Sequence, residues 1–540
     1  MNKQHYSIIV IVFLCLLPAL SCTKLKDNNY NQVIVDQFEP DEKDLEPLVA
    51  AAYIPWRKLF NFWQSYFWAQ ELSADNLLIP KRPWGWVDDG GYRRFHYHKW
   101  TSEDAIPVNC WTRTYEGINN CNRVIEQIAT DVIPVSQGKE NILAELKVLR
   151  ASYYWVLCDM YGNVPIVTDF TVPEGYLPEQ NTRKEVYDFI VKEITESIPL
   201  LSENRDQSTY GRFNQWAART LLAKVYLNAE VYSGTPAWNQ CLAQCDTVIS
   251  SGLYSLELNQ KGVFITENER SPEIIFPLPF DEKYVTDWNA FDHHMQTLPQ
   301  ECQATYNLQY SPWGGICAVP QFINTFDPDD ARYKDNWIKG QQYSSGGEAL
   351  IVQNGRFTGQ PLNLINVVPA IDTSEAIHGF RLGKFEIKQG ITSRLSNDFP
   401  LLRYADVILM KAECLLRTGR AAEAAVEVTK IRQRCFADNP AKATVTAADL
   451  QQGSSYDYGQ RDVHGSTSEG GADVQYGRLL DELGWEFFEE CHRRQDLIRF
   501  NVFARKSWLS HTPNGDYREL FPIPQSELNK NTNLQQNAGY

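Results

Sequence analysis

The sequence predicts a mainly α-helical protein, in which a scaffold of tetratricopeptide-like helical hairpins carries a loop-rich insert with short helices and minor strands. Three observations support this prediction. Helical periodicity recurs in three pairs of segments, small alanines stand where paired helices would cross, and the periodicity is lost between residues 256 and 400. We expect the scaffold at about residues 40–255 and 400–505, within one domain spanning residues 22–540.

The first 21 residues predict a secretory signal peptide. An apolar run at residues 8–17 follows a basic residue and ends at Pro18, which is half the length that a membrane-spanning helix needs. Cys22 follows a small residue and resembles the lipidated cysteine of bacterial lipoproteins. We therefore expect residues 1–21 to be removed and Cys22 to be acylated, so that lipid (palmitate) tethers the protein to a membrane.

The first predicted hairpin joins two helices. Apolar residues recur at helical spacing over residues 140–161, which indicates an amphipathic helix that ends at Gly162. Thr182 and Glu185 form a capping-box pattern, so a second helix is expected to begin there.

Two more hairpins follow the same pattern, at residues 213–229 with 238–250 and at residues 401–417 with 421–434. The segment between them is predicted to hold loops, short helices and minor strands, including a short segment at residues 273–276. A later stretch, residues 451–477, has six glycines and few apolar residues, and we expect a mobile surface loop there.

Composition excludes some classes of function. The 540 residues are 43% hydrophobic and 22% charged, enough apolar material for a large core. The net charge of −16 argues against a nucleic-acid partner. The chain has 12 cysteines, and ten remain after Cys15 and Cys22 are set aside. In a secreted protein we expect some of these ten to form disulfides.

The sequence has no local motif of the common hydrolases, nucleotidases or dehydrogenases, so we predict no catalytic residues and no cofactor. Cys241 and Cys245 lack the further ligands of a zinc site. The pair His293 and His294 and the acidic run Asp327, Asp329 and Asp330 could be drawn as a metal site. We interpret them as a solvated loop with a turn at Asp327, and predict no metal.

Several separated segments together resemble one family, the SusD/RagB family of surface nutrient-binding lipoproteins. The resemblance covers nearly the whole mature chain and rests on residues 144–155 with 161–165, 402–413, 482–487 with 493–499, and 522–540. Departures from the family pattern lie at Leu483, Cys491 and Ala538. The resemblance implies a non-catalytic protein at the outer membrane that binds a glycan or oligosaccharide. It also implies a partner, a TonB-dependent SusC-like transporter, over which the lipoprotein acts as a lid.

Charged residues inside these motifs are interpreted as structural. Ion pairs that hold helices together are expected from two sets of charges, one on a shared helix face and one spaced four residues apart. The sets are Arg403, Asp406 and Glu413, and Glu486, Glu490 and Arg494.

Aromatic residues in irregular segments are the candidate ligand contacts, because sugars stack their flat faces on rings and their hydroxyls bond to polar side chains. Trp84 and Trp86 flank a glycine, and Trp288, Asn289 and Trp313 lie in the insert. The alternative for each ring is a role in the local core or in contact with the transporter. Other classes of function also stay open, namely a peptide binder in the same transporter role, a secreted glycoside hydrolase, or a purely structural scaffold.

Overall fold

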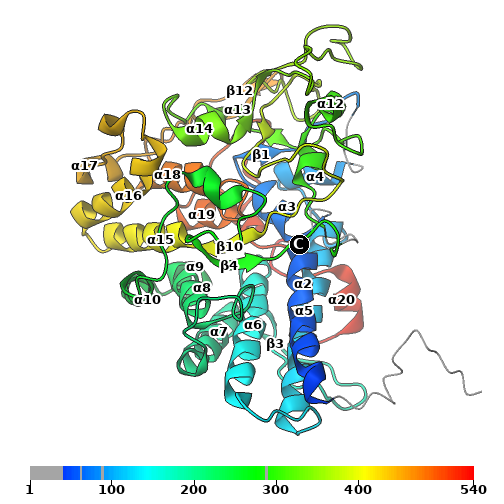
Figure 1. Ribbon diagram of the computed structural model, residues 1–540, viewed down its shortest axis with the longest axis vertical. Helices are drawn as coiled ribbons and strands as arrows, with labels where there is room; N and C mark the ends of the chain where they lie inside the picture. The colour runs from blue at the N-terminus through cyan, green and yellow to red at the C-terminus, as the bar shows by residue number, and fades with distance from the viewer. Residues whose placement is uncertain (1–40, 61–63, 85, 87–89, 286–289) are drawn as a thin grey trace, which may run out of the picture.

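The computed structural model describes residues 41–60, 64–84, 86, 90–285 and 290–540 (Figure 1). About 45% of the structure is helical, with 19 α-helices and only small strands among the described residues. The predicted fold class, a mainly α-helical protein of tetratricopeptide-like type, is confirmed.

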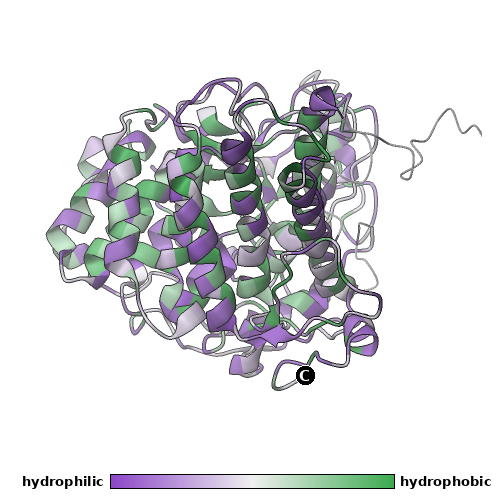
Figure 2. Cartoon of the chain, turned by 90° about the horizontal axis from the view of Figure 1, so that it is seen from below, coloured by the Kyte–Doolittle hydropathy of each residue, from purple (hydrophilic) through white to green (hydrophobic). Residues whose placement is uncertain are grey.

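Eight helices form a row in which each helix packs against the next. In packing order they are α2 (Leu45–Phe60), α5 (Ala105–Ala129), α6 (Lys139–Met160), α7 (Arg183–Ser197), α8 (Gln215–Leu227), α10 (Trp238–Ser250), α15 (Tyr404–Arg417) and α16 (Ala421–Cys435). The row contains the three predicted hairpins, and Figure 2 shows helices standing side by side, with hydrophilic and hydrophobic residues on each. Helix α10 packs directly on α15, so the row continues across the whole insert.

Helix α6 differs from the amphipathic helix that its spacing predicts. Every residue from Ala144 to Met160 except Lys147 is buried. The helix lies between α5 and α7 and also contacts α2 and α8, so neighbours cover it on all sides. Buried charges on α6 have partners, as in the ion pair between Arg150 and Glu193 at 2.7 Å.

The capping box at the start of α7 is confirmed. The Thr182 N–H donates to Glu185 Oε2 at 2.7 Å, and the Glu185 N–H donates back to Thr182 Oγ1 at 3.3 Å. These reciprocal bonds satisfy backbone donors that the first turn of a helix leaves without partners.

An antiparallel pair of strands, β4 (Ile274–Leu278) and β10 (Phe399–Arg403), brings the two ends of the insert together. The pair includes most of the predicted 273–276 segment, and its register places Phe399 opposite Leu278. The other elements of the insert are short, as predicted. They are η6 (Gln260–Phe264), α11 (His293–Thr297), η7 (Gln300–Cys302), α12 (Gln303–Tyr306), β5 (Cys317–Ala318), α13 (Pro320–Ile323), α14 (Ala331–Asp335), β6 (Trp337–Ile338), β7 (Gly340–Gln341), β8 (Asn363–Leu364) and β9 (Arg381–Leu382).

The remaining elements are also short and lie outside the helical row and the insert. They are η3 (Glu42–Asp44), α3 (Tyr66–Glu71), β1 (Leu77–Leu78), α4 (Gly91–His96), β2 (Val164–Pro165), β3 (Gln180–Asn181), η5 (Ile198–Leu200), α9 (Ala229–Ser233), η8 (Pro440–Lys442), α17 (Ala447–Leu450), β11 (Arg461–Asp462), β12 (Gly465–Ser466), α18 (Gly477–Phe487), α19 (Arg493–Arg499), η9 (Asp516–Glu519) and α20 (Gln525–Lys530).

The prediction of a surface loop at residues 451–477 is wrong for part of that segment. Tyr456 and Tyr458 are buried, and the Tyr458 hydroxyl donates to Asp75 Oδ2 at 3.0 Å. A Cβ atom at Gly477 would lie 2.0 Å from the Ser454 backbone nitrogen, so glycine is required for this close packing. The segment has little regular structure. Buried aromatic side chains and tight backbone contacts fix its position, instead of the hydrogen bonds of a helix.

The charged residues of the family motifs form a buried network that we call the ionic network. It consists of Glu273, Arg332, Arg403, Arg434, Glu482, Glu486 and Glu490. Arg403 Nη1 lies 2.6 Å from Glu273 Oε1 and 2.8 Å from Glu486 Oε1, and its Nε lies 2.6 Å from Glu490 Oε2. Arg403, Glu486 and Glu490 of the predicted sets belong to this network, and Asp406 and Glu413 are also buried and paired, with Lys224 at 3.1 Å and with Arg499 at 2.7 Å. The structural role that we predict for these charges is therefore confirmed.

The partners differ from those that sequence spacing indicates. Glu486 and Glu490 pair with Arg403 at the end of β10, whereas Arg494 pairs with Asp159 of α6 at 2.7 Å. A spacing of four residues implies neighbours on one helix, but α18 ends at Phe487, so the predicted partners are not on a single helix. Long-range packing selects the partners instead.

Candidate ligand-binding site

The structure describes three of the five predicted site residues. Trp84 follows β1 and is 61% exposed, whereas Trp86 and Trp313 are half-buried. Trp288 and Asn289 lie outside the described residues.

Trp86 and Trp313 meet, although 227 residues separate them in the chain. The Trp86 N–H donates to the Trp313 carbonyl oxygen at 2.9 Å, and the ring centroids are 5.9 Å apart in an edge-on arrangement. The Trp86 ring also lies 4.7 Å from Tyr92 and 5.6 Å from Trp68, both of which are buried. Trp86 therefore belongs to an aromatic cluster. These contacts favour a role for its ring in the local core over a role in ligand binding.

Trp84 and Trp313 line one small hollow, which we call the tryptophan pocket. Its volume is about 20 Å³, and it is lined by Arg82, Pro83, Trp84, Pro299, Gln300, Glu301, Trp313, Gly314, Asn354, Ala376 and Arg381. The lining residues come from the segment that follows β1, from the start of η7 and from the later loops of the insert. Two rings, two amides, a carboxyl group and two guanidinium groups thus converge on one place.

Arg82 is a residue that sequence reasoning missed. Its Nη1 donates to the Gly314 carbonyl oxygen at 3.0 Å, its Nη2 to the His378 carbonyl oxygen at 3.1 Å, and its Nε to the Glu375 carbonyl oxygen at 3.2 Å. Arg82 therefore holds the loop that carries Trp313 against the segment that carries Trp84. A single arginine beside Trp84 is the only sequence signal, and its partners lie more than 230 residues away.

The floor of the pocket is positively charged. Arg381 is fully buried, and its Nη2 donates to the Ala376 carbonyl oxygen at 2.9 Å. Burial, together with the nearby charge of Arg82, lowers the pKa of Arg381 to about 9. Glu301 adds a carboxylate to the lining, and its Oε1 accepts the Gln353 N–H at 2.8 Å. Donors and acceptors around one exposed and one half-buried ring suit a neutral polyhydroxyl ligand.

The histidine and aspartate residues that could be drawn as a metal site lie apart from this pocket. Asp327 begins the predicted turn, because its carbonyl oxygen accepts the Asp330 N–H at 3.0 Å. The prediction of a solvated loop is wrong for His293, His294 and Asp330, which are buried. Burial lowers the pKa of both histidines, that of His294 to about 4. Among the described residues no group of three or more His, Cys, Asp or Glu side chains could hold a metal ion.

The expectation of disulfides is wrong for the ten cysteines that the structure describes, all of which are free thiols. Each is buried, and burial raises the pKa of most of these thiols, as at Cys110 and Cys121. Cysteine packs as a small apolar side chain in a helical core, so its burial here has a packing explanation.

No helix among the described residues is both long and apolar enough to cross a bilayer.

Two family models match the chain. The model of the SusD family matches residues 272–540, and a model described as starch-binding associating with outer membrane matches residues 82–227.

Known proteins with similar sequences or structures agree with these matches. Starch-binding protein SusD of Bacteroides thetaiotaomicron is 24% identical over 522 residues, covering 89% of this chain and 86% of that protein. A laminarin-binding SusD-like protein is similar in structure, with a TM-score of 0.70, 21% identity, and coverage of 93% of this chain and 100% of that one. Surface glycan-binding protein A of Bacteroides thetaiotaomicron, in complex with laminarihexaose, has a TM-score of 0.69, 19% identity, and coverage of 92% and 99%. These structural similarities show a shared fold.

Proposed function

This chain belongs to the SusD family, and we propose that it is a non-catalytic protein that binds a glycan or oligosaccharide on the surface around Trp84, beside the tryptophan pocket. The observation that carries this proposal is the 61% exposure of Trp84 beside Trp313 and a set of polar side chains. Leaving a large indole in water is unfavourable, and a ring that stacks on a sugar face would remove that cost on binding.

We also propose that the bound glycan passes to a TonB-dependent, SusC-like transporter in the outer membrane. Lipid on Cys22 would hold the protein beside that transporter at the cell surface. A lid over the transporter would confine the ligand between two surfaces and raise its effective concentration at the pore. Family membership and the match to a model described as associating with outer membrane support this role.

Calorimetry on residues 23–540 tests the binding proposal. The protein is titrated with a panel of polysaccharides, oligosaccharides and peptides, and each mixture is checked for cleavage products. We expect saturable binding of a glycan without products, weakened about tenfold by Trp84→Ala or Trp313→Ala. Tyr176→Ala is the matched control, because Tyr176 is 47% exposed and does not line the pocket.

Three outcomes would contradict the proposal. Cleavage products would identify a hydrolase. Binding of peptides alone would identify a different class of nutrient. No binding by any compound of the panel would show that this protein alone does not capture the ligand. Protease treatment of intact cells tests the surface location separately. A protein that resists digestion until the cells are lysed would not face the cell exterior.

A further inference from the structure

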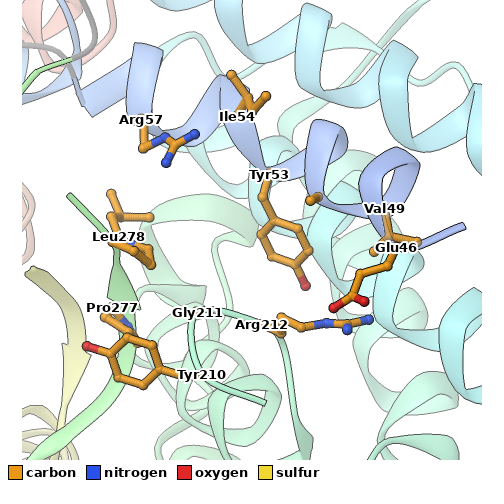
Figure 3. Close-up of a pocket in the computed structure, with 12 residues that line it drawn as sticks. Glu46, Val49, Tyr53, Ile54, Arg57, Tyr210, Gly211, Arg212, Pro277 and Leu278 are labelled. Atoms are coloured by element: carbon orange, nitrogen blue, oxygen red, sulfur yellow. The ribbon is translucent and has the colours of Figure 1, made fainter. Parts of the chain in front are cut away.

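A second cavity lies on another part of the molecule, between α2, the loop at residues 210–212 and the end of β4 (Figure 3). We call it the helix α2 pocket. Its volume is about 260 Å³, much larger than the tryptophan pocket, and the two share no lining residue. Val49, Pro277 and Leu278 provide apolar walls.

Most polar side chains of this pocket already have partners. The Tyr53 hydroxyl donates to Glu145 Oε1 at 2.7 Å and accepts the Phe213 N–H at 2.9 Å, and the Tyr210 hydroxyl donates to Asp398. Arg212 binds Glu145 through two hydrogen bonds, of 2.8 and 2.9 Å. These groups have little capacity left for the hydroxyls of a sugar.

Arg57 is the one cation of the pocket lining that differs. Its side chain enters the pocket from α2, and no hydrogen bond or ion pair joins it to any part of the chain that the structure describes. Burial lowers the pKa of the Arg57 guanidinium, with no contribution from a carboxylate. Glu46 lies three turns earlier on α2, about 16 Å along the helix axis, on the side of the pocket where Arg212 lies in Figure 3.

We propose that the helix α2 pocket binds a small organic acid that has an apolar body and one carboxylate. The guanidinium of Arg57 offers a planar pair of donors that matches a carboxylate, and the apolar walls would cover the rest of the molecule. A phosphate carries more charge and more acceptor oxygens than one unpaired guanidinium satisfies. Glu46 would repel the carboxylate from the far end, so that it is directed toward Arg57.

The test uses 3-phenylpropionate and its uncharged amide as probes, titrated into residues 23–540. We expect the acid to bind about tenfold more tightly than the amide. Arg57→Gln should remove that difference, and Ala50→Phe, which adds a ring from an exposed position of the pocket wall, should weaken both probes. Lys58→Gln is the matched control, because Lys58 pairs with Glu116 at 2.7 Å and does not line the pocket.

Equal binding of acid and amide, an unchanged preference in Arg57→Gln, or no binding of the acid up to about 10 mM would overturn the proposal. Circular dichroism of each variant separates loss of binding from loss of folding. A parallel glycan titration keeps the two sites distinct, because Trp84→Ala should leave binding of the acid unchanged. Binding of the acid by a protein that binds no glycan would support this site while contradicting the proposed function.

Discussion

The ionic network and the tryptophan pocket are both assembled from distant segments. They differ in whether their side chains are buried and paired with one another or left exposed to solvent. In the ionic network, Arg403 meets three carboxylates within 2.8 Å, and all its members are buried. In the tryptophan pocket, Trp84 stays 61% exposed. A cluster whose members satisfy one another stabilises the fold, whereas a surface that keeps an apolar ring in water has capacity to bind something else.

Trp84 and Trp86 show the same contrast within two residues of the chain. The ring of Trp86 packs against Trp68, Tyr92 and Trp313. Trp84 has no aromatic ring neighbour among the described residues. Residue type alone therefore does not distinguish a packing ring from a binding ring, and position relative to the rest of the fold does.

The largest expected effect comes from breaking the ionic network. Arg403→Met removes the cation that contacts Glu273, Glu486 and Glu490 together in a buried site, although Arg434 still pairs with the first two and Lys384 with the third. We expect the free energy of unfolding to fall by about 3–5 kcal/mol. Urea titration measures the change. Arg420→Met is the control, because Arg420 and its partner Glu423 are exposed and their loss should have no measurable effect. Equal stability of the two variants would show that the ionic network does not stabilise the fold more than an exposed ion pair does.

Acid should weaken the same network. Burial alone would raise the pKa of Glu482, but Arg332, Arg432 and Arg478 overcome this and lower it from 4.5 to about 2. A carboxyl group with a lowered pKa stabilises the fold above its unfolded value of 4.5, and this contribution is lost as the pH falls toward about 2.

We expect Glu482 to contribute at most roughly 3 kcal/mol to this pH dependence. Urea titrations from about pH 6 to about pH 3 measure it, and the gap between the native protein and Glu482→Gln should narrow as the pH falls. A gap that stays constant with pH would show that the charge of Glu482 is not the source of its contribution.

Trp84 and Trp86 test the same difference at the pocket, because one ring is exposed and the other is packed. Trp86→Ala removes a ring that packs on three others, so the free energy of unfolding should fall by about 2 kcal/mol. Trp84→Ala removes an exposed ring and should change it by less than about 0.5 kcal/mol. Chemical denaturation of both variants tests this. A large loss of stability in Trp84→Ala would assign that ring to the core and weaken the binding proposal.

The smallest loss of stability that we expect from breaking an interaction of the fold concerns a strictly local one. Thr182→Ala removes half of the capping box at the start of α7, and we expect a loss of about 1 kcal/mol. Thermal unfolding measures it, with Thr182→Ser as the variant that keeps the hydroxyl and most of the stability. If the alanine and serine variants unfold at the same temperature, the cap contributes nothing.

Much of the fold could be predicted because its signals are local. The hairpins, the capping box and the short elements of the insert follow from residues within a few positions of one another. The predictions that were wrong depend on what covers a segment. Helix α6 has the spacing of an amphipathic helix but is buried on all sides. Tyr456 and Tyr458 are buried within a segment whose composition predicts a surface loop.

For the candidate site, residue type could point to aromatic residues in irregular segments but not to their neighbours. Arg82, which positions the Trp313 loop, has its partners more than 230 residues away. Arg57 stands out only because no residue that the structure describes pairs with it. The sequence by itself determined the helical scaffold and could propose the candidate rings, since periodicity, capping and residue chemistry act over short distances. Only the tertiary structure decided which charges pair, which ring stays exposed and where cavities remain, because those depend on contacts between segments that are remote in the chain.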